Sequence, residues 1–194
     1  LGSASTYTGS AGDDTFMMLN AGDVLDGGAG TGDTLNITET GILGGIAIDL
    51  SSATDQVTSY DSVANGAVQK NFENVNVTGY ANFGASITGS AGANTITGTA
   101  GTDNISGGAG ADTIIVDAGT VANSDIMDGG AGDDTLQIAT GLTATIDGDG
   151  DIAAVENVSL VGTAIVILTG QTEAFVVSDG TTDADNEITG GSGN

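Results

Sequence analysis

The chain has 194 residues, of which 26 are Asp or Glu and only one, Lys70, is basic, so its formal net charge is −25 at pH 7. This balance argues against nucleic acid and anionic membrane surfaces as partners, because proteins bind both through Lys and Arg. The chain also lacks Cys and His, which removes a disulfide framework and closes the usual thiol and imidazole routes of catalysis.

Repulsion among so many negative charges opposes a compact fold unless positive ions from solution neutralise them. Strong acidity with few aromatic residues is also typical of disorder. The hydrophobic fraction of 39%, however, is that of a globular protein, so we expect disorder only when the counter-ion is absent. No stretch approaches the roughly 20 apolar residues of a membrane helix. The chain begins with Leu1 and stops within a glycine motif, and we expect it to be a piece of a longer protein.

Glycine-rich nonapeptides of the form G-x-x-G-x-[D/N]-x-U-x, with U a large apolar residue, recur along the chain. The first is GSAGDDTFM from Gly9, and a variant from Gly27, GGAGTGDTL, has one extra residue that moves its acid to Asp33. Three follow without a gap from Gly89, namely GSAGANTIT, GTAGTDNIS and GGAGADTII. GGAGDDTLQ starts at Gly129, and the terminal GGSGN begins a further copy.

The segments 36–85 and 138–185 lack this motif and alternate apolar and polar residues, as in Ile46–Leu50 and Ile165–Leu168, which predicts strands. No segment of ten or more residues has a helical period, so we predict an all-β chain. A longer repeat is also present, because FENVNV at 72–77 recurs as VENVSL at 155–160. It indicates two related modules, residues 1–88 and 89–194, stacked on one axis.

The nonapeptides resemble the RTX (hemolysin-type) calcium-binding repeat, most clearly over residues 9–35, 86–137 and 186–194. The resemblance implies a right-handed parallel β-roll or β-helix solenoid with calcium bound in the turns. It also implies that two nonapeptides complete one coil, so that turns 18 residues apart, as at Gly9 and Gly27, lie one above the other. Export by a type I secretion system, with its C-terminal signal outside this sequence, is a further implication.

Calcium requires six to eight oxygen ligands, which two stacked turns supply and one turn does not. Glycine lets the backbone carbonyls converge, and the sixth position adds a carboxylate. The residues predicted to contribute to metal binding are Gly9, Ala11, Gly12, Asp14, Asp23, Gly27, Gly28, Gly30, Asp33, Gly89, Ala91, Asn94, Asp103, Gly107, Gly108, Gly110, Asp112, Asp125, Gly129, Gly130, Gly132 and Asp134. We expect about three to six ions in total.

The spacing of 18 residues predicts specific pairs of ligands. Asp14 should face Asp33, with Asp23 in reserve from the degenerate turn between them. Asn94 should face Asp112, and the neutral side chain of Asn94 should weaken that site.

Two further positions need a change of register. Gly107 and Gly129 are 22 residues apart, which predicts a bulge of four residues before Asp134 stacks on Asp112. Asp103 should face the opposite edge, where a full site is doubtful because residues 116–123 lack the Gly pair. Asp125 holds the sixth position of its own degenerate repeat.

Other acidic residues and the apolar positions have simpler interpretations. Any single Asp could be an ordinary turn residue, since Asp and Gly both favour turns. The cluster Asp147–Asp151 opens like an EF-hand loop but lacks its Gly and its final Glu, so it is either an accessory calcium loop or a solvated turn. The apolar positions should point inward and the neighbouring Thr outward; they are Phe16, Ile96, Ile105, Ile114 and Leu136.

We expect no enzymatic activity, because the acids are explained by the turns and Ser has no His partner. The favoured interpretation is a secreted structural protein of the cell surface that binds calcium, folds with it and assembles with itself, as in an S-layer, filament or large adhesin. The alternatives are a calcium-folded secretion or stabilisation domain of an enzyme or toxin, and a module that binds glycan or ice. Partners would be further copies of the chain and cell-surface polysaccharide.

Overall fold

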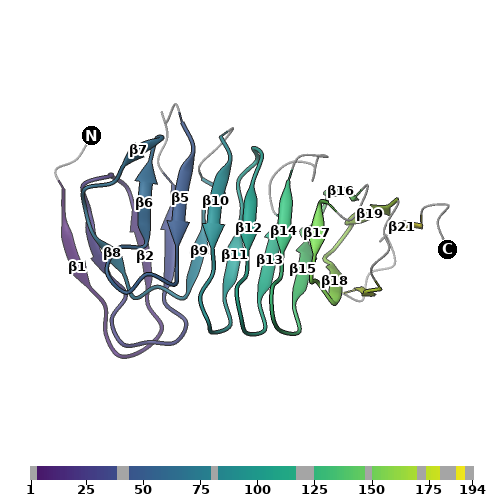
Figure 1. Ribbon diagram of the computed structural model, residues 1–194, viewed down its shortest axis with the longest axis horizontal. Helices are drawn as coiled ribbons and strands as arrows, with labels where there is room; N and C mark the ends of the chain where they lie inside the picture. Colours follow the sequence, from purple (N-terminus) through teal and green to yellow (C-terminus); the bar gives the residue numbers. More distant parts are fainter. Residues whose placement is uncertain are drawn as a thin grey trace.

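The computed structural model describes residues 4–38, 44–79, 83–116, 125–146, 150–169, 174–179 and 187–190. Within these ranges the regular structure is entirely β, and no helix has the length and apolar character needed to cross a membrane. Figure 1 shows the coils side by side along one long axis, with the two termini at opposite ends. The predicted all-β fold is confirmed as a parallel β-solenoid of about 7 turns.

The largest sheet gives the solenoid its continuity. Its parallel strands are, in order, β2 (Thr15–Met18), β4 (Thr34–Ile37), β9 (Asn74–Asn76), β11 (Thr95–Thr97), β13 (Thr113–Val116), β15 (Thr135–Ile138), β18 (Asn157–Leu160) and β20 (Val176–Asp179). Because β9 pairs with β11, the sheet runs through the predicted module boundary at residue 88. The division into two modules stays a prediction.

Between successive strands of this large sheet, the chain forms strands that belong to other sheets. A three-stranded sheet contains β1 (Thr6–Thr8), β3 (Val24–Asp26) and β8 (Gln69–Lys70). A seven-stranded sheet contains β5 (Ile46–Asp49), β10 (Ala85–Thr88), β12 (Asn104–Ser106), β14 (Ile126–Asp128) and β17 (Ile152–Ala153), and it ends in the antiparallel strands β6 (Val57–Tyr60) and β7 (Val63–Ala64). Within the segment 36–85, β5 therefore joins the stacked strands of the solenoid, and β6 and β7 extend the same sheet as antiparallel strands.

The C-terminal coils contain an additional sheet. It consists of β16 (Thr143–Ile146), β19 (Ile165–Leu168) and β21 (Glu187–Gly190), all parallel. The strand predicted at 165–168 is thereby confirmed. A coil with a third strand is longer, which accounts for the wider spacing of the turns in this part of the chain.

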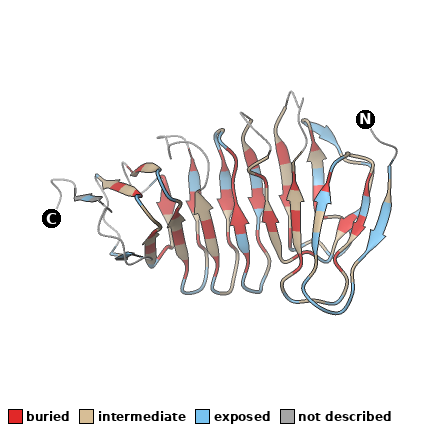
Figure 2. Cartoon of the chain, turned by 180° about the vertical axis from the view of Figure 1, so that it is seen from behind, coloured by how far each residue is buried: buried red, intermediate tan, exposed pale blue. Residues whose placement is uncertain are grey.

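The core is a narrow column of aliphatic side chains between the sheets. Ile96, Ile114 and Leu136 occupy one row of the large sheet and are buried, as is Ile105 in the facing sheet. Phe16 points inward but is only partly buried, because β2 is the first strand of its sheet; its ring meets Phe72 edge-on at 5.8 Å. Figure 2 shows the same gradient, with buried residues concentrated in the middle coils and exposed strands at the ends.

Removing a core side chain should be costly and removing an exposed one should not. Ile114→Ala leaves a cavity between Ile96 and Leu136 and should lower the free energy of unfolding by about 2–5 kcal/mol. Met17→Ala, at a side chain that is 59% exposed, should change it by about 0.5 kcal/mol or less. Urea unfolding with saturating calcium measures both values, and equal losses would contradict this description of the core.

Candidate calcium sites

A column of turns lies along one edge of the solenoid, and each turn leads directly into a strand of the large sheet. We call it the first column; it contains residues 9–14, 27–33, 71–73, 89–94, 107–112, 129–134 and 154–156. Stacking of the strands places these turns one above another, because neighbouring strands are about 4.8 Å apart.

Glycine is required at the start of each nonapeptide turn because the next turn approaches it closely. A Cβ on Gly107 would meet the carbonyl oxygen of Gly129, and one on Gly129 would overlap the carbonyl oxygen of Ala154. The following residues, Gly108 and Gly130, have φ values of 104° and 95°, which only glycine adopts without strain. The glycines thus bring backbone carbonyl oxygens to a shared edge.

Carboxylates join the successive turns through a repeated hydrogen bond. The backbone N–H of Asp14 donates to Oδ1 of Asp33 at 2.7 Å. The N–H of Asn94 donates to Oδ1 of Asp112 at 2.7 Å, and the N–H of Asp112 donates to Oδ1 of Asp134 at 2.7 Å. The structure therefore brings together the three pairs that the spacing predicted, including the pair that needs the bulge of four residues.

The second carboxylate oxygens of two of these residues are isolated. Asp112 and Asp134 are 2% and 1% exposed, and Oδ2 of each is buried without a hydrogen-bond partner. Burial raises the pKa of both carboxyls, and nearby carboxylates, Asp134 for Asp112 and Glu156 for Asp134, raise it further. A buried, unpaired carboxylate is costly unless a cation compensates it.

This donor set fits calcium, which prefers carboxylate and carbonyl oxygens. In the described ranges, no three acidic side chains gather closely enough to hold a metal ion on side chains alone. Further ligands are therefore needed, and the close approach of the Gly129 and Ala154 carbonyl oxygens to the preceding turns makes backbone ligands available.

A comparison with known families agrees with this geometry. Residues 86–120 and 122–137 match the family model of the RTX calcium-binding nonapeptide repeat, in 4 copies. This segment is an RTX repeat segment. Searches of curated proteins and of solved structures gave no significant match.

The turns at 9–14 and 27–33 lie outside the matched residues, and the turn at 9–14 has the same internal hydrogen bonds as the matched turn at 89–94. The N–H of Ser10 donates to Oδ2 of Asp14 at 2.6 Å, and the N–H of Ser90 donates to Oδ1 of Asn94 at 2.6 Å. In both turns the Ser hydroxyl contacts the same side-chain oxygen. The first RTX-like turn of the chain therefore folds as the matched turn does.

A second column of acidic residues lies on the opposite edge, before the strands of the other sheets. Asp103 accepts hydrogen bonds from the N–H groups of Ala85 and Thr99, and its own N–H donates to Oδ1 of Asp125 at 3.0 Å. Burial raises the pKa of Asp103 and Asp125. The sequence left a partner for Asp103 in doubt, but Asp125 takes that place 22 residues on.

The prediction that Asp23 supports the Asp14–Asp33 pair is wrong. Asp23 precedes β3 and therefore belongs to the second column, where its carboxylate accepts hydrogen bonds from the N–H groups of Ser5 and Leu19. A degenerate turn between two stacked turns must lie on the other edge, because each coil crosses from one edge to the other.

Part of the predicted acidic cluster 147–151 lies outside the described residues, as does most of the terminal GGSGN. Asp151, which is described, is buried and close enough to Asp125 to raise the pKa of Asp125. Asp151 precedes β17 (Ile152–Ala153) and therefore extends the second column. Val158, at the twelfth position of the loop, is buried in β18.

Two further acidic residues of the first column, Glu73 and Glu156, occupy the position of the Asp ligands and were not predicted from the sequence. Oε2 of Glu73 accepts the N–H of Asp33 at 2.9 Å, and Oε2 of Glu156 accepts the N–H of Asp134 at 2.8 Å. The signal was present in the repeated FENVNV and VENVSL segments, but without the nonapeptide glycines it did not indicate a turn.

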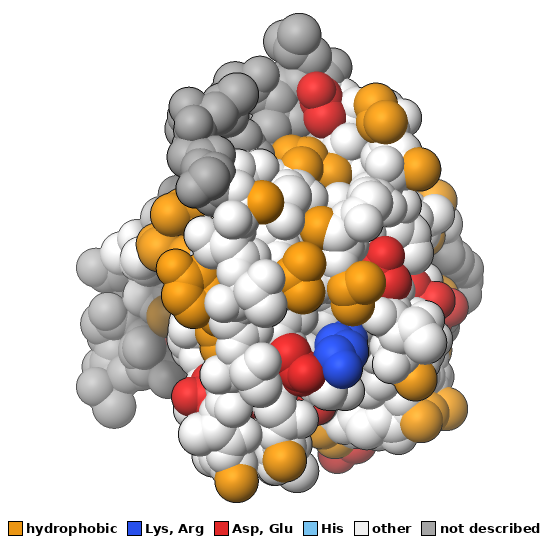
Figure 3. All heavy atoms as spheres, turned by 90° about the vertical axis from the view of Figure 1, so that its left-hand side faces the viewer, with side chains coloured by type: hydrophobic (Ala, Val, Ile, Leu, Met, Phe, Trp, Pro, Cys, Tyr) orange, Lys and Arg blue, Asp and Glu red, His pale blue; other side chains and the backbone are white. Residues whose placement is uncertain are grey.

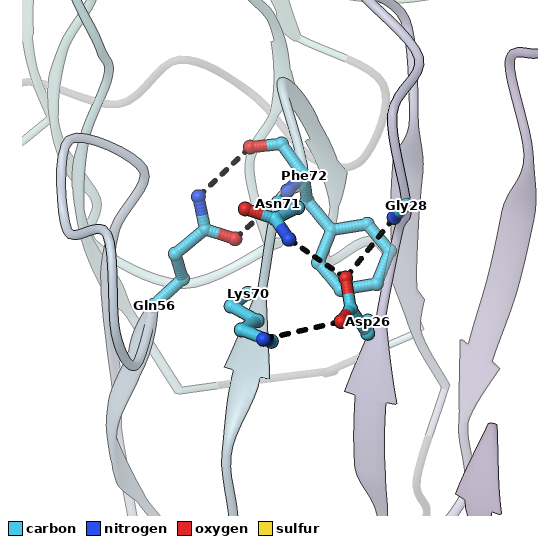
Figure 4. A network of polar contacts seen from close by, with 6 residues as sticks. All are labelled: Asp26, Gly28, Gln56, Lys70, Asn71 and Phe72. Carbon is cyan, nitrogen blue, oxygen red and sulfur yellow. Dashed lines mark hydrogen bonds and ion pairs between the residues drawn. The ribbon is translucent and has the colours of Figure 1, made fainter. Parts of the chain in front are cut away.

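The single basic residue lies beside the first column (Figure 4). Lys70 Nζ is 3.2 Å from Asp26 Oδ2, and Asn71 Nδ2 donates to Asp26 Oδ1 at 2.7 Å. The hydrogen bond from Asn71 and the Lys70 ammonium lower the pKa of Asp26. Gln56 accepts the N–H of Phe72 at 3.0 Å and donates to its carbonyl oxygen at 2.9 Å, which ties the β5–β6 segment to the turn at 71–73.

Asp134→Asn tests the charge of a buried carboxylate at nearly constant shape. The amide oxygen still accepts the N–H of Asp112, but the negative charge is lost, so calcium affinity should fall by about tenfold or more, equivalent to about 1.4 kcal/mol. Calorimetric titration measures the change. Asp133→Asn removes an equal charge from the adjacent, exposed residue; an equal loss in that variant would show that net charge alone sets the affinity.

The raised pKa values predict opposite effects of acid on the metal-free and calcium-bound forms. A carboxyl whose pKa is higher in the folded than in the unfolded state binds protons more readily when folded, so the metal-free fold gains stability as pH falls from 7 toward the ordinary value of 3.8. Calcium competes with those protons, so its affinity should fall over the same interval.

Far-ultraviolet circular dichroism of metal-free protein and calcium titrations, each at pH 7 and pH 5, measure the two trends. Metal-free protein with less β structure at pH 5 than at pH 7 would contradict the burial of these carboxyls.

Proposed function

We propose that this chain is an extracellular structural segment that folds on binding calcium and then assembles with further copies, as part of an S-layer, a surface filament or a large adhesin. The observation that carries the proposal is the pair of buried, unpartnered carboxylate oxygens on Asp112 and Asp134 within RTX turns. In a chain with a net charge of −25, such groups require a bound cation.

Calcium acts in this proposal as a folding switch. RTX repeats are typical of proteins that bacteria secrete, and calcium in the cytosol is too scarce to fill weak sites. The uncompensated charge then keeps the chain unfolded and ready for export. Outside the cell, calcium binds the folded form, and each independent site adds about 2.7 kcal/mol of stability when calcium is at 100 times its dissociation constant.

The two ends of the solenoid support self-assembly. At the N-terminal end Tyr7, Met17 and Leu19 are exposed, and Figure 3 shows hydrophobic side chains spread over this face. Val176 and Ile188 are exposed toward the C-terminal end. Among the residues that the structure describes, the large sheet begins with β2 and ends with β20, and an edge strand is a template for another chain. Head-to-tail addition of one end to the other does not close, so it produces filaments.

Two alternatives share the same chemistry. A secretion or stabilisation domain of an enzyme or toxin would use the folding switch without assembly, its catalytic part lying outside this sequence. A glycan- or ice-binding module is favoured only by a row of outward Thr on the large sheet, in which Thr95, Thr113 and Thr135 are in register. We assign no catalytic activity, because the acids form stacked turns.

A calcium titration of metal-free protein distinguishes these functions. Far-ultraviolet circular dichroism should change from coil to β with calcium and not with magnesium, which demands a smaller, octahedral site. Light scattering should then show growth into large particles. Protein that is fully β in chelator would overturn the folding switch.

Val176→Lys separates assembly from folding. A charge on the edge strand β20 opposes pairing with another chain, so this variant should keep the transition in circular dichroism and lose the large particles. Unchanged particles would exclude head-to-tail stacking, and a wild-type protein that folds but stays monomeric would favour the secretion domain.

A further inference from the structure

Two short turns, at residues 71–73 and 154–156, close successive runs of nonapeptide turns in the first column. Each contains a non-glycine residue with positive φ, Asn71 at 59° and Ala154 at 48°. Their contacts to the preceding turn are the same. The N–H groups of Glu73 and Asn74 donate to the carbonyl oxygen of Asp33, and those of the equivalent residues 156 and 157 donate to the carbonyl oxygen of Asp134.

The Glu of each short turn takes the place of the Asp of a nonapeptide turn. Within a run, the N–H of Asp112 donates to a carboxylate oxygen of Asp134 at 2.7 Å. At the end of that run, the N–H of Asp134 donates in the same way to Glu156 at 2.8 Å. The longer side chain of Glu compensates for the missing residues of the shorter turn, so the column of carboxylates continues for one step beyond the last glycine loop.

The junction between the turns at 129–134 and 154–156 also contains an oxygen atom that no donor satisfies. Oδ2 of Asp134 is buried and unpartnered, and it lies beside the Cα of Gly129, where the carbonyl oxygen of Ala154 also approaches. The carboxylates of Asp128, Asp133 and Glu156 add negative charge around Asp134. A space lined by carboxylate and carbonyl oxygens and surrounded by negative charge is suited to a cation.

The junction between the short turn at 71–73 and the following turn at 89–94 contains an amide donor instead of an unpartnered oxygen. The side-chain nitrogen Nδ2 of Asn94 donates a hydrogen bond to the carbonyl oxygen of Glu73. A donor at this point occupies a carbonyl that a cation would otherwise use, so the contact between turns 71–73 and 89–94 separates two runs.

We propose that Glu156 is a calcium ligand that completes a site with Asp134, and, from the matching geometry of the two short turns alone, that Glu73 does the same with Asp33, whose Oδ2 accepts the N–H of Gly30 at 3.3 Å. The proposal rests on the calcium binding proposed above and adds two ligands outside the glycine motif. Each short turn then ends a run of calcium ions. The next run begins at the turn of Asn94, with no ion between this turn and the short turn at 71–73.

Glu156→Gln and Glu73→Gln test this in the full chain. Gln keeps an oxygen that accepts the N–H of Asp134 or Asp33 but loses the charge. Counting bound calcium by native mass spectrometry, with affinities from calorimetry, should show one tight ion fewer in each variant and two fewer in the double variant. Asp179→Asn, which removes an equal charge from the exposed end of β20, should leave the ion count unchanged.

An unchanged ion count and affinity in both Gln variants would overturn the proposal, because the Glu side chains would then only accept backbone N–H groups. Should Glu156→Gln fail to fold in calcium, Glu73→Gln gives the same test in the first run. A wild-type chain that binds no calcium would instead overturn the proposed function itself.

Discussion

The burial of carboxylates in stacked turns is the constraint on which the rest of this structure depends. Five acidic residues of the first column each use one oxygen to accept an N–H from the preceding turn, namely Asp33, Glu73, Asp112, Asp134 and Glu156. Asp112 and Asp134 retain a second, buried oxygen without a partner. Protein groups cannot compensate this charge, because the single Lys is engaged with Asp26. The stability of the column therefore depends on ions from solution.

Turn and core are coupled through the register of the strands. The row that contains Ile96, Ile114 and Leu136 is buried only when Asn94, Asp112 and Asp134 are stacked, since a slip of one residue would turn each strand over. Ions that fix the turns thus also fix the core. This coupling is the physical basis of the calcium-driven folding that we propose, because a site shared by two turns does not exist in the unfolded chain.

Departures from the repeat do not interrupt the stack of turns, because the extra residues lie outside the first column. The 40 residues between Asp33 and Glu73 include β5 and a hairpin, and the 22 residues between Asp134 and Glu156 include β16. In both cases the chain returns to the column with a short turn that carries Glu. The solenoid therefore accommodates insertions of different length while the carboxylates keep their spacing.

The sequence by itself determined the β structure, the inward Ile and Leu positions and the Asp14–Asp33, Asn94–Asp112 and Asp112–Asp134 pairs. These follow from a local period that sets side-chain direction and turn chemistry together. Only the tertiary structure decided that Asp23 lies on the opposite edge, that Asp125 stacks on Asp103, and that Glu73 and Glu156 join the first column. Those contacts depend on where the chain returns after an irregular segment, which is fixed by pairing with strands already in the stack and not by spacing along the chain.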